Sequence, residues 1–140
     1  MKAVSLFSCA GIGELLLDKV SVDVLVANEI IEKRAEIYKK LNPKTEVVIG
    51  DIKNDFIKKM IYKYSSDNPD LLIATPPCQG LSSIGKNKLI KDLNDDERNF
   101  LIFDIIEIAK TFDFKYILIE NVPKYLDMFF PKNGRFYRMK

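Results

Sequence analysis

The sequence predicts an α/β fold, built on a mostly parallel sheet with helices on both of its faces. Short runs rich in Val, Ile and Leu alternate with helical patterns of about ten residues, which is typical of successive βαβ units. The apolar runs contain few polar residues, as expected of strands that are covered on both faces. With 140 residues, 47% of them apolar, the chain is long enough for the core of one domain.

The N-terminal part of the chain predicts two strands joined by a helix. Ala3–Phe7 is an apolar run and is the first expected strand. A helix is expected over Gly11–Lys19, where three leucines at 15–17 supply an apolar face. Val22–Ala27 is the second expected strand, which completes the first βαβ unit.

The next part of the chain predicts two helices on either side of a short strand. The first helix is expected over Ile31–Leu41 and ends at the Asn-Pro stop signal of residues 42–43. Glu46–Ile49 is the third expected strand. The second helix is expected over Phe56–Tyr64, because the turn-forming residues 65–69 follow it directly.

The C-terminal part predicts two more strands, Leu71–Thr75 and Tyr116–Ile119. The polar stretch between them, residues 82–96, is expected to be a long loop, and it is followed by a helix over Phe100–Thr111. Residues 126–140 are basic and aromatic and have no clear period. They are either a frayed tail or a segment that continues into further structure.

Composition excludes several kinds of function. The net charge of +2 gives no global field that favours nucleic acid, and the absence of histidine excludes histidine-based catalysis. Two cysteines, Cys9 and Cys78, are too few soft ligands for a zinc site, so no metal is expected. Free cysteines without a secretory signal indicate a reducing cytoplasm. No apolar run approaches the ~18 residues that a membrane span needs.

The most informative motif is the run Pro76-Pro77-Cys78-Gln79, which follows the fourth expected strand. Two prolines fix two φ angles and remove two backbone donors, so the chain presents the thiol in a stiff turn at the sheet edge where ligands bind. Cys78 is therefore a candidate nucleophile, activated by loop amides, a nearby cation or the substrate. The alternative is a packing cysteine, which is the more usual role of a free thiol and is the one expected for Cys9.

Small or acidic residues follow the first three expected strands. The turn after the first strand lets a cofactor approach the backbone, or else only allows tight packing of strand on helix. Glu29 can accept hydrogen bonds from ribose hydroxyls, or can be an acid favoured by the dipole of the next helix. Asp51 can accept from an adenine amino group, or can cap the next helix. Together the three positions suggest a nucleoside cofactor that lies across the sheet edge.

A further carboxylate and amide, Glu120-Asn121, follow the fifth expected strand. At that edge Glu120 lies beside the loop of the thiol and could give a proton to a heterocyclic base. It could equally be a surface acid that ends a strand. Partial burial is expected because three apolar residues, 117–119, precede it.

These motifs, in this order, resemble those of the cytosine-C5 DNA methyltransferases over nearly all of residues 1–125. The resemblance implies the fold of S-adenosylmethionine-dependent methyltransferases, which is Rossmann-like and here incomplete at the C-terminus. Residues 1–125 would be the N-terminal part of the cofactor-binding and catalytic domain, and 126–140 a basic aromatic tail. The target-recognition domain and the last motifs of the family are absent from the sequence.

The family's functional positions carry over residue by residue. The resemblance implies catalytic roles for Cys78, Glu120, Pro77 and Asn121. It implies contacts to S-adenosylmethionine from Phe7, Ser8, Cys9, Ala10, Gly11, Ile12, Glu29, Ile30, Asp51, Ile52 and Pro76. It implies contacts to DNA from Gln79, Ser82 and Arg98. Two positions depart from the family: Cys9 replaces a glycine and could crowd the cofactor, and Ile30 stands where an aromatic side chain often stacks on adenine.

The implied activity is transfer of a methyl group from S-adenosylmethionine to C5 of cytosine in double-stranded DNA, through a covalent bond between Cys78 and C6. The expected setting is a restriction-modification system in the cytoplasm of a prokaryote. Because the sequence-reading parts are absent, the chain is expected to be either one half of a split methyltransferase, with a second polypeptide that supplies them, or a truncated gene product. The alternatives are a tRNA cytosine-5 methyltransferase, and a non-catalytic remnant or cofactor-binding subunit.

Overall fold

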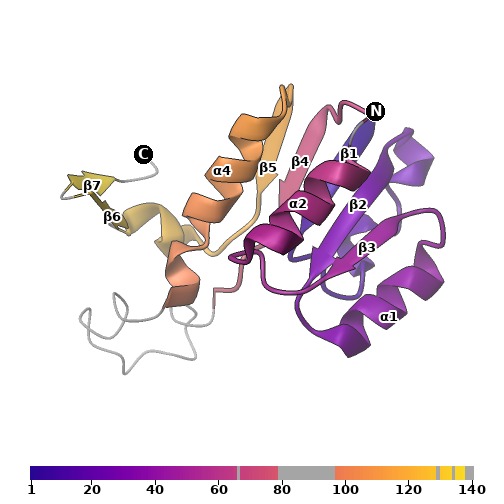
Figure 1. Ribbon diagram of the computed structural model, residues 1–140, viewed down its shortest axis with the longest axis horizontal. Coiled ribbons are helices and arrows are strands. Elements are labelled where there is room, and N and C mark those ends of the chain that lie inside the picture. The colour runs from indigo at the N-terminus through magenta and orange to yellow at the C-terminus, as the bar shows by residue number, and fades with distance from the viewer. Residues whose placement is uncertain (66, 79–96, 129, 134, 138–140) are drawn as a thin grey trace.

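The computed structural model describes residues 1–65, 67–78, 97–128, 130–133 and 135–137, and its centre is a five-stranded parallel sheet (Figure 1). The strands are β1 (Lys2–Leu6), β2 (Asp23–Glu29), β3 (Glu46–Ile49), β4 (Leu71–Ala74) and β5 (Tyr116–Ile119). Their order across the sheet is β3-β2-β1-β4-β5, and every neighbouring pair is parallel. The parallel α/β class and the five expected strands are confirmed, with bounds that move by at most two residues.

The order of the strands places the carboxyl ends of β1, β2, β3 and β4 at one edge of the sheet. Leu6 at the end of β1 pairs with Asn28 on one side and with Ala74 on the other. Glu29 at the end of β2 pairs with Ile49 at the end of β3. Residues that follow these strands therefore meet, although up to 70 residues separate them in the sequence.

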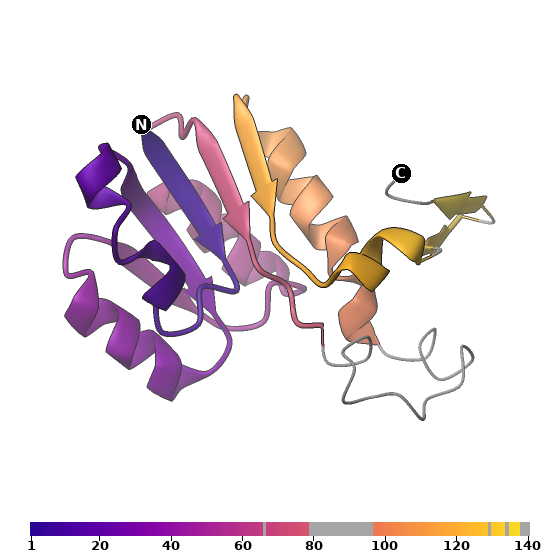
Figure 2. The ribbon, with the colours of Figure 1, turned by 180° about the vertical axis from the view of Figure 1, so that it is seen from behind.

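Within the described residues, three α-helices cover the two faces of the sheet: α1 (Glu32–Leu41), α2 (Asp55–Tyr64) and α4 (Ile102–Thr111). α2 and α4 lie together on one face, where their apolar residues pack against Val4, Leu6 and Leu72 (Figure 1). α1 lies on the opposite face with the chain that follows β1, as the view from behind shows (Figure 2). In the part of the chain that the structure describes, none of the helices has the length and apolarity to cross a membrane.

The segment after β1 is not the α-helix expected over Gly11–Lys19. It forms two single-turn 3-10 helices, η1 (Ile12–Glu14) and η2 (Asp18–Val20). Ile12, Leu15 and Leu16 are all exposed, so no buried apolar face supports a longer helix. Because helices in proteins are stabilised mainly by packing of such a face, the leucine run alone was a misleading signal.

Two helix starts also differ from expectation. The alternative role of Asp51 as an N-cap is wrong, because Asn54 caps α2 with its side chain accepting from the Phe56 amide at 2.8 Å. Phe100 ends a separate 3-10 turn, η4 (Glu97–Phe100), and α4 begins only at Ile102.

The C-terminal segment contains more structure than its lack of period indicated. A 3-10 helix, η5 (Pro123–Asp127), leads into two short antiparallel strands, β6 (Phe130–Lys132) and β7 (Arg135–Tyr137). Tyr125 and Phe130 are buried, with their ring centres 5.4 Å apart, and Phe130 also meets the edge of the Phe103 ring. Burial raises the pKa of Tyr125 to about 12. These contacts anchor the segment on α4.

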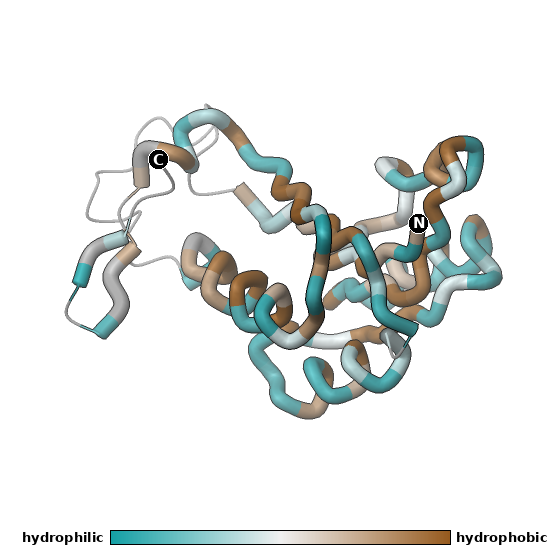
Figure 3. Tube along the Cα trace, turned by 90° about the horizontal axis from the view of Figure 1, so that it is seen from above, coloured by the Kyte–Doolittle hydropathy of each residue, from teal (hydrophilic) through white to brown (hydrophobic). Residues whose placement is uncertain are grey.

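β5 is incompletely covered, although its residues are as apolar as those of the other strands. Tyr116 is 60% exposed, Ile117 52% and Leu118 56%. Among the described residues β5 pairs only with β4, so its outer edge is open. Elsewhere hydrophobic residues gather at the centre of the molecule and the outermost turns are mostly hydrophilic (Figure 3).

A buried cation joins the two helices on the α2 face, and its loss is expected to destabilise the fold. Lys58 of α2 lies 2.9 Å from Asp104 and 2.6 Å from Glu107, both on α4. Burial disfavours the ammonium, but its hydrogen bonds to the two carboxylates outweigh this and raise the pKa of Lys58.

We expect Lys58→Met to lower the free energy of unfolding by about 2 kcal/mol, because Asp104 is left largely buried and unpaired. Urea unfolding measures this, and the exposed neighbour Lys59→Met is the control, which should change little. Equal changes in the free energy of unfolding in Lys58→Met and Lys59→Met would contradict this prediction.

Candidate active site

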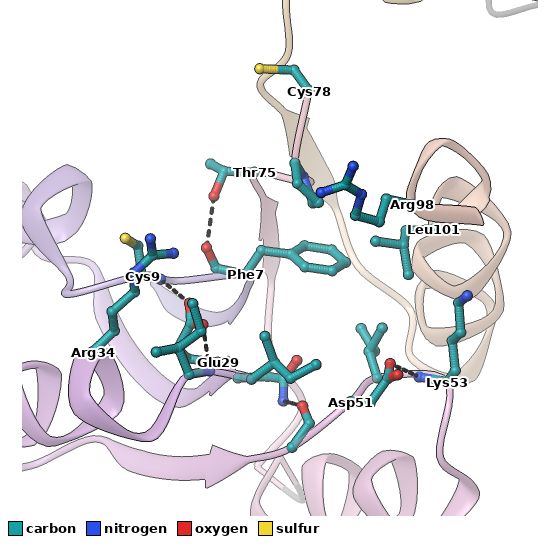
Figure 4. A pocket seen from close by; sticks show the side chains of 16 residues that line it. Phe7, Cys9, Glu29, Arg34, Asp51, Lys53, Thr75, Cys78, Arg98 and Leu101 are labelled. Carbon is teal, nitrogen blue, oxygen red and sulfur yellow. Dashed lines mark hydrogen bonds between the residues drawn. The ribbon is translucent and has the colours of Figure 1, made fainter. Parts of the chain in front are cut away.

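A pocket of about 570 Å³ opens at the carboxyl edge of the sheet (Figure 4). It gathers residues from the ends of four strands and from the start of η4. Its lining contains nine of the predicted site residues: Phe7, Cys9, Glu29, Ile30, Asp51, Ile52, Pro77, Cys78 and Arg98. Glu29 and Asp51 lie at the lower side of the pocket in Figure 4, and Cys78 lies at its upper rim.

The turn after β1 is held in a shape that brings its backbone to the pocket. Cys9 and Gly11 both have positive φ, 53° and 77°, and Ser8 between β1 and the turn is buried. The Ser8 amide donates to the Asn28 carbonyl at 3.0 Å, and the Cys9 amide donates to Glu29 Oε2 at 2.9 Å. The turn is thus fastened to the end of β2 at two successive residues.

Glu29 is the buried acid of the pocket, only 4% exposed. Besides the Cys9 amide on one oxygen, its other oxygen accepts from the Ile31 amide at 2.8 Å, just before α1 begins. Both of the roles considered for this residue therefore fit: it lies at the N-terminus of a helix, and its carboxylate faces the pocket. Each carboxylate oxygen has a second lone pair that could accept from a ligand hydroxyl.

Apolar side chains and a second acid form the adjacent wall. Ile52 is buried and Ile30 is 60% exposed, so the two can contact a flat ligand placed between the ends of β2 and β3. Asp51 is exposed, and its Oδ1 accepts from the Lys53 amide at 3.0 Å. Asn28, which the sequence analysis did not select, fixes this wall by donating from Nδ2 to the carbonyls of Val48 and Gly50.

The thiol turn is also fastened by side chains of neighbouring strands. Pro76 is buried, and Pro77 and Cys78 are half-buried. Asn121 donates from Nδ2 to the Pro76 carbonyl at 3.1 Å, and Thr75 Oγ1 donates to the Phe7 carbonyl at 3.0 Å. Asn121 therefore contacts the thiol turn and not the pocket itself.

Glu120 is not brought into the pocket of Cys78. It lies in a second hollow of about 340 Å³, with Ala10, Ile12 and Leu118, on the β5 side of the turn. Thr75 and Cys9 line both hollows, so the two are adjacent. Glu120 is exposed rather than partly buried, because the apolar residues before it belong to the uncovered strand β5.

Arg98 lines the pocket beside the thiol turn, and Figure 4 shows its side chain directed toward the loop that carries Cys78. It lies in η4, next to Glu97, which pairs with Lys53 at 2.8 Å. This ion pair lowers the pKa of Glu97 and joins η4 to the loop after β3. Gln79 and Ser82, the other two expected DNA contacts, lie outside the described residues. Arg34, Lys53 and Thr75 line the pocket but carry no motif that would have indicated it.

Cys9 is exposed at the pocket and is not the packing residue that was expected. Its positive φ is a conformation that glycine adopts without strain. We expect Cys9→Gly to raise the free energy of unfolding by about 0.5–1 kcal/mol, because glycine adopts this φ without strain. The same substitution should tighten binding of S-adenosylhomocysteine a few-fold, because the cysteine side chain narrows the pocket. Urea unfolding and calorimetry measure the two effects. Ser21→Gly, at φ 58° and far from the pocket, is the control: it should raise the free energy of unfolding and leave the affinity for S-adenosylhomocysteine unchanged. Weaker binding by Cys9→Gly would contradict the expectation.

No cluster of three or more potential metal ligands occurs among the residues that the structure describes. The described residues place a thiol, two acids and several cations at the pocket, and a further carboxylate in the adjacent hollow.

Comparisons with known proteins show which sequences and folds this chain is similar to. The family model for C-5 cytosine-specific DNA methylase matches residues 1–133. The Type II methyltransferase M1.HgaI of Avibacterium volantium is 48% identical over 86% of this chain, and M.NgoPII of Neisseria gonorrhoeae is 36% identical over 87%. A solved E. coli prophage protein, described as a DNA modification methyltransferase, superposes with a TM-score of 0.68 at 28% identity over 88% of the chain. The chain spans 34%, 33% and 32% of these three proteins.

Proposed function

Since the chain belongs to the C-5 cytosine-specific DNA methylase family and has the fold of S-adenosylmethionine-dependent methyltransferases, we propose that it carries the cofactor site and the nucleophile of a DNA cytosine-5 methyltransferase. The observation that carries the proposal is that Cys78 and Glu29, from the ends of β4 and β2, line one pocket. We assign it to a Type II restriction-modification system, as the names of its relatives suggest.

The residues of the pocket fit S-adenosylmethionine, which supplies a methyl group bound to a sulfonium. Glu29 is a buried carboxylate with lone pairs left for two ribose hydroxyls. Ile30 and Ile52 would hold the adenine ring between them, and Asp51 would accept from its amino group. The turn from Phe7 to Ile12 would then lie along the methionine part, which agrees with its small residues.

Cys78 would act as the nucleophile toward cytosine. Its thiolate would add to C6, and the π electron pair of the C5–C6 bond would move to C5. C5 could then take the methyl group as the bond between methyl and sulfonium breaks, which leaves the neutral thioether S-adenosylhomocysteine. Loss of the C5 proton to a base and departure of the Cys78 thiolate from C6 restore the aromatic ring. Glu120, across Thr75 from the thiol turn, would hold a proton at N3 during the addition. The cytosine must leave the helix to reach Cys78.

A partner polypeptide would complete the enzyme. The chain spans about a third of the length of its relatives, and β5 presents an apolar surface that a further segment can cover. Residues 1–125 would contribute the N-terminal part of the catalytic domain, and the partner would contribute recognition of the DNA sequence. Pro77, Gln79, Ser82 and Arg98 would contact the flipped base or the DNA backbone next to it.

Covalent trapping tests the proposal. DNA that contains 5-fluorocytosine blocks loss of the C5 substituent, so the bond between Cys78 and C6 persists and is seen on a denaturing gel. The chain is co-expressed with the C-terminal two thirds of the Avibacterium volantium relative and assayed on duplex DNA and on tRNA. An adduct on DNA supports the proposal, and an adduct on tRNA alone would move the substrate to RNA. Absence of any adduct with the partner supplied would indicate a non-catalytic chain, and full site-specific methylation by the chain alone would refute the need for a partner.

A further inference from the structure

A buried carboxylate outside the pocket, Glu14, joins three elements on the α1 face of the sheet. Glu14 is 8% exposed, and its two oxygens accept separate hydrogen bonds, one from Ser5 Oγ and one from the Tyr38 hydroxyl. Ser5 lies in β1, Glu14 in η1 and Tyr38 in α1. Burial raises the pKa of Glu14, and it also raises that of Tyr38. Burial of a carboxyl group costs free energy of desolvation, which its hydrogen bonds must offset.

The same tyrosine supports the turn that borders both hollows. A Cβ atom added to Gly11 would lie 2.8 Å from the Tyr38 ring, so the backbone of the turn rests directly on that ring. The Glu14 amide donates to the Gly11 carbonyl at 3.2 Å, and the Gly11 amide donates to the Ser8 carbonyl at 2.9 Å. Tyr38 therefore contacts the turn in two ways, through its ring beneath Gly11 and through its hydroxyl on Glu14.

The turn is thus held at both of its ends by acids. At its start the Cys9 amide is bound by Glu29, and at its end Glu14 is bound by Tyr38. Glu29 and Tyr38 belong to β2 and to the α1 helix that follows it, so one βα unit fixes the shape of the whole turn. Each oxygen of Glu14 accepts from a protein hydroxyl, and the residue also borders the second hollow.

We infer that Glu14 and Tyr38 are positioning residues for the cofactor, which act through the turn of residues 8–13. The inference rests on the proposed function for the identity of the ligand. The inference also states that the hydrogen bond between Glu14 and Tyr38 sets the shape of the turn. This part of it can be tested without any ligand.

Tyr38→Phe is the sharpest test, because it removes the hydroxyl and keeps the ring beneath Gly11. Loss of one hydrogen bond to a buried carboxyl group should make amide hydrogen exchange in residues 9–13 of the ligand-free chain about tenfold faster. Binding of S-adenosylhomocysteine, measured by calorimetry, should weaken about tenfold as well. Ile108→Val, a buried α4 substitution on the other face of the sheet, is the control for general loss of stability.

The outcomes separate the inference from the proposed function. If exchange in residues 9–13 is no faster in Tyr38→Phe than in Ile108→Val, the inference is wrong. If exchange is faster but the affinity is unchanged, the residues are structural and do not position the cofactor. If the unsubstituted chain, with its partner supplied, binds no S-adenosylhomocysteine, the proposed cofactor is wrong, whatever the exchange shows. Non-additive effects in the double variant of Glu14→Gln with Tyr38→Phe would assign the change to this one hydrogen bond.

Discussion

Cys78→Ser is expected to abolish methyl transfer, lowering its rate by about 10⁴-fold or more. A serine hydroxyl is almost wholly protonated at neutral pH, and the chain has no histidine to activate it. The assay uses the chain with its partner polypeptide, labelled S-adenosylmethionine and duplex DNA. The adduct with 5-fluorocytosine DNA should disappear in the same variant.

Binding and a second thiol supply the controls for this substitution. Cys78 lies at the rim of the pocket, opposite Glu29, so binding of S-adenosylhomocysteine to Cys78→Ser should change little (Figure 4). Cys9→Ser, which alters the other cysteine of the chain, should still form the adduct. Methyl transfer by Cys78→Ser at more than a small fraction of the original rate would show that the thiol is not the nucleophile.

Glu29→Ala is expected to weaken binding of S-adenosylhomocysteine by about 100-fold or more. The substitution removes the acceptor proposed for the ribose hydroxyls. It also leaves the amides of Cys9 and Ile31 without their carboxylate, so the turn after β1 loses its fastening to β2. Calorimetry on the chain with its partner measures the affinity.

Two variants separate these contributions. Glu29→Gln keeps the shape of the side chain and one acceptor oxygen, so its affinity should lie between those of the original chain and of Glu29→Ala. Glu32→Ala removes an exposed acid of the first turn of α1 and should leave the affinity unchanged. If Glu29→Ala and Glu32→Ala bind equally well, Glu29 does not contact the cofactor.

The strand framework could be predicted from the sequence because its signals are local. Glu46–Ile49 and Tyr116–Ile119 have the bounds that their apolar runs predict. The segment after β1 could not be predicted in the same way, since three adjacent leucines look alike whether or not a surface exists to cover them. Leu16 is 62% exposed, and only the three-dimensional arrangement reveals this.

The meeting of Glu29 and Asp51 in one pocket was predictable for a related reason. Glu29 and Asp51 each follow a strand, and a parallel sheet brings such positions to one edge. Asn28 and Tyr38 were not found, because their roles depend on contacts with residues about 20 positions away in the sequence. The separation of Glu120 from the pocket of Cys78 could not be predicted either, because it depends on how the turns after β4 and β5 lie in space and not on the residue types of the motif.

The proposed partner segment would make folding of this chain and its assembly through the uncovered surface of β5 one linked equilibrium. A segment that covers Tyr116, Ile117 and Leu118 binds the native state and not the unfolded chain, so it shifts the unfolding equilibrium by mass action. At a partner concentration of 100 times Kd the shift is about 2.7 kcal/mol. The melting temperature of the chain, measured at increasing concentrations of the proposed partner, would then report its binding without any DNA.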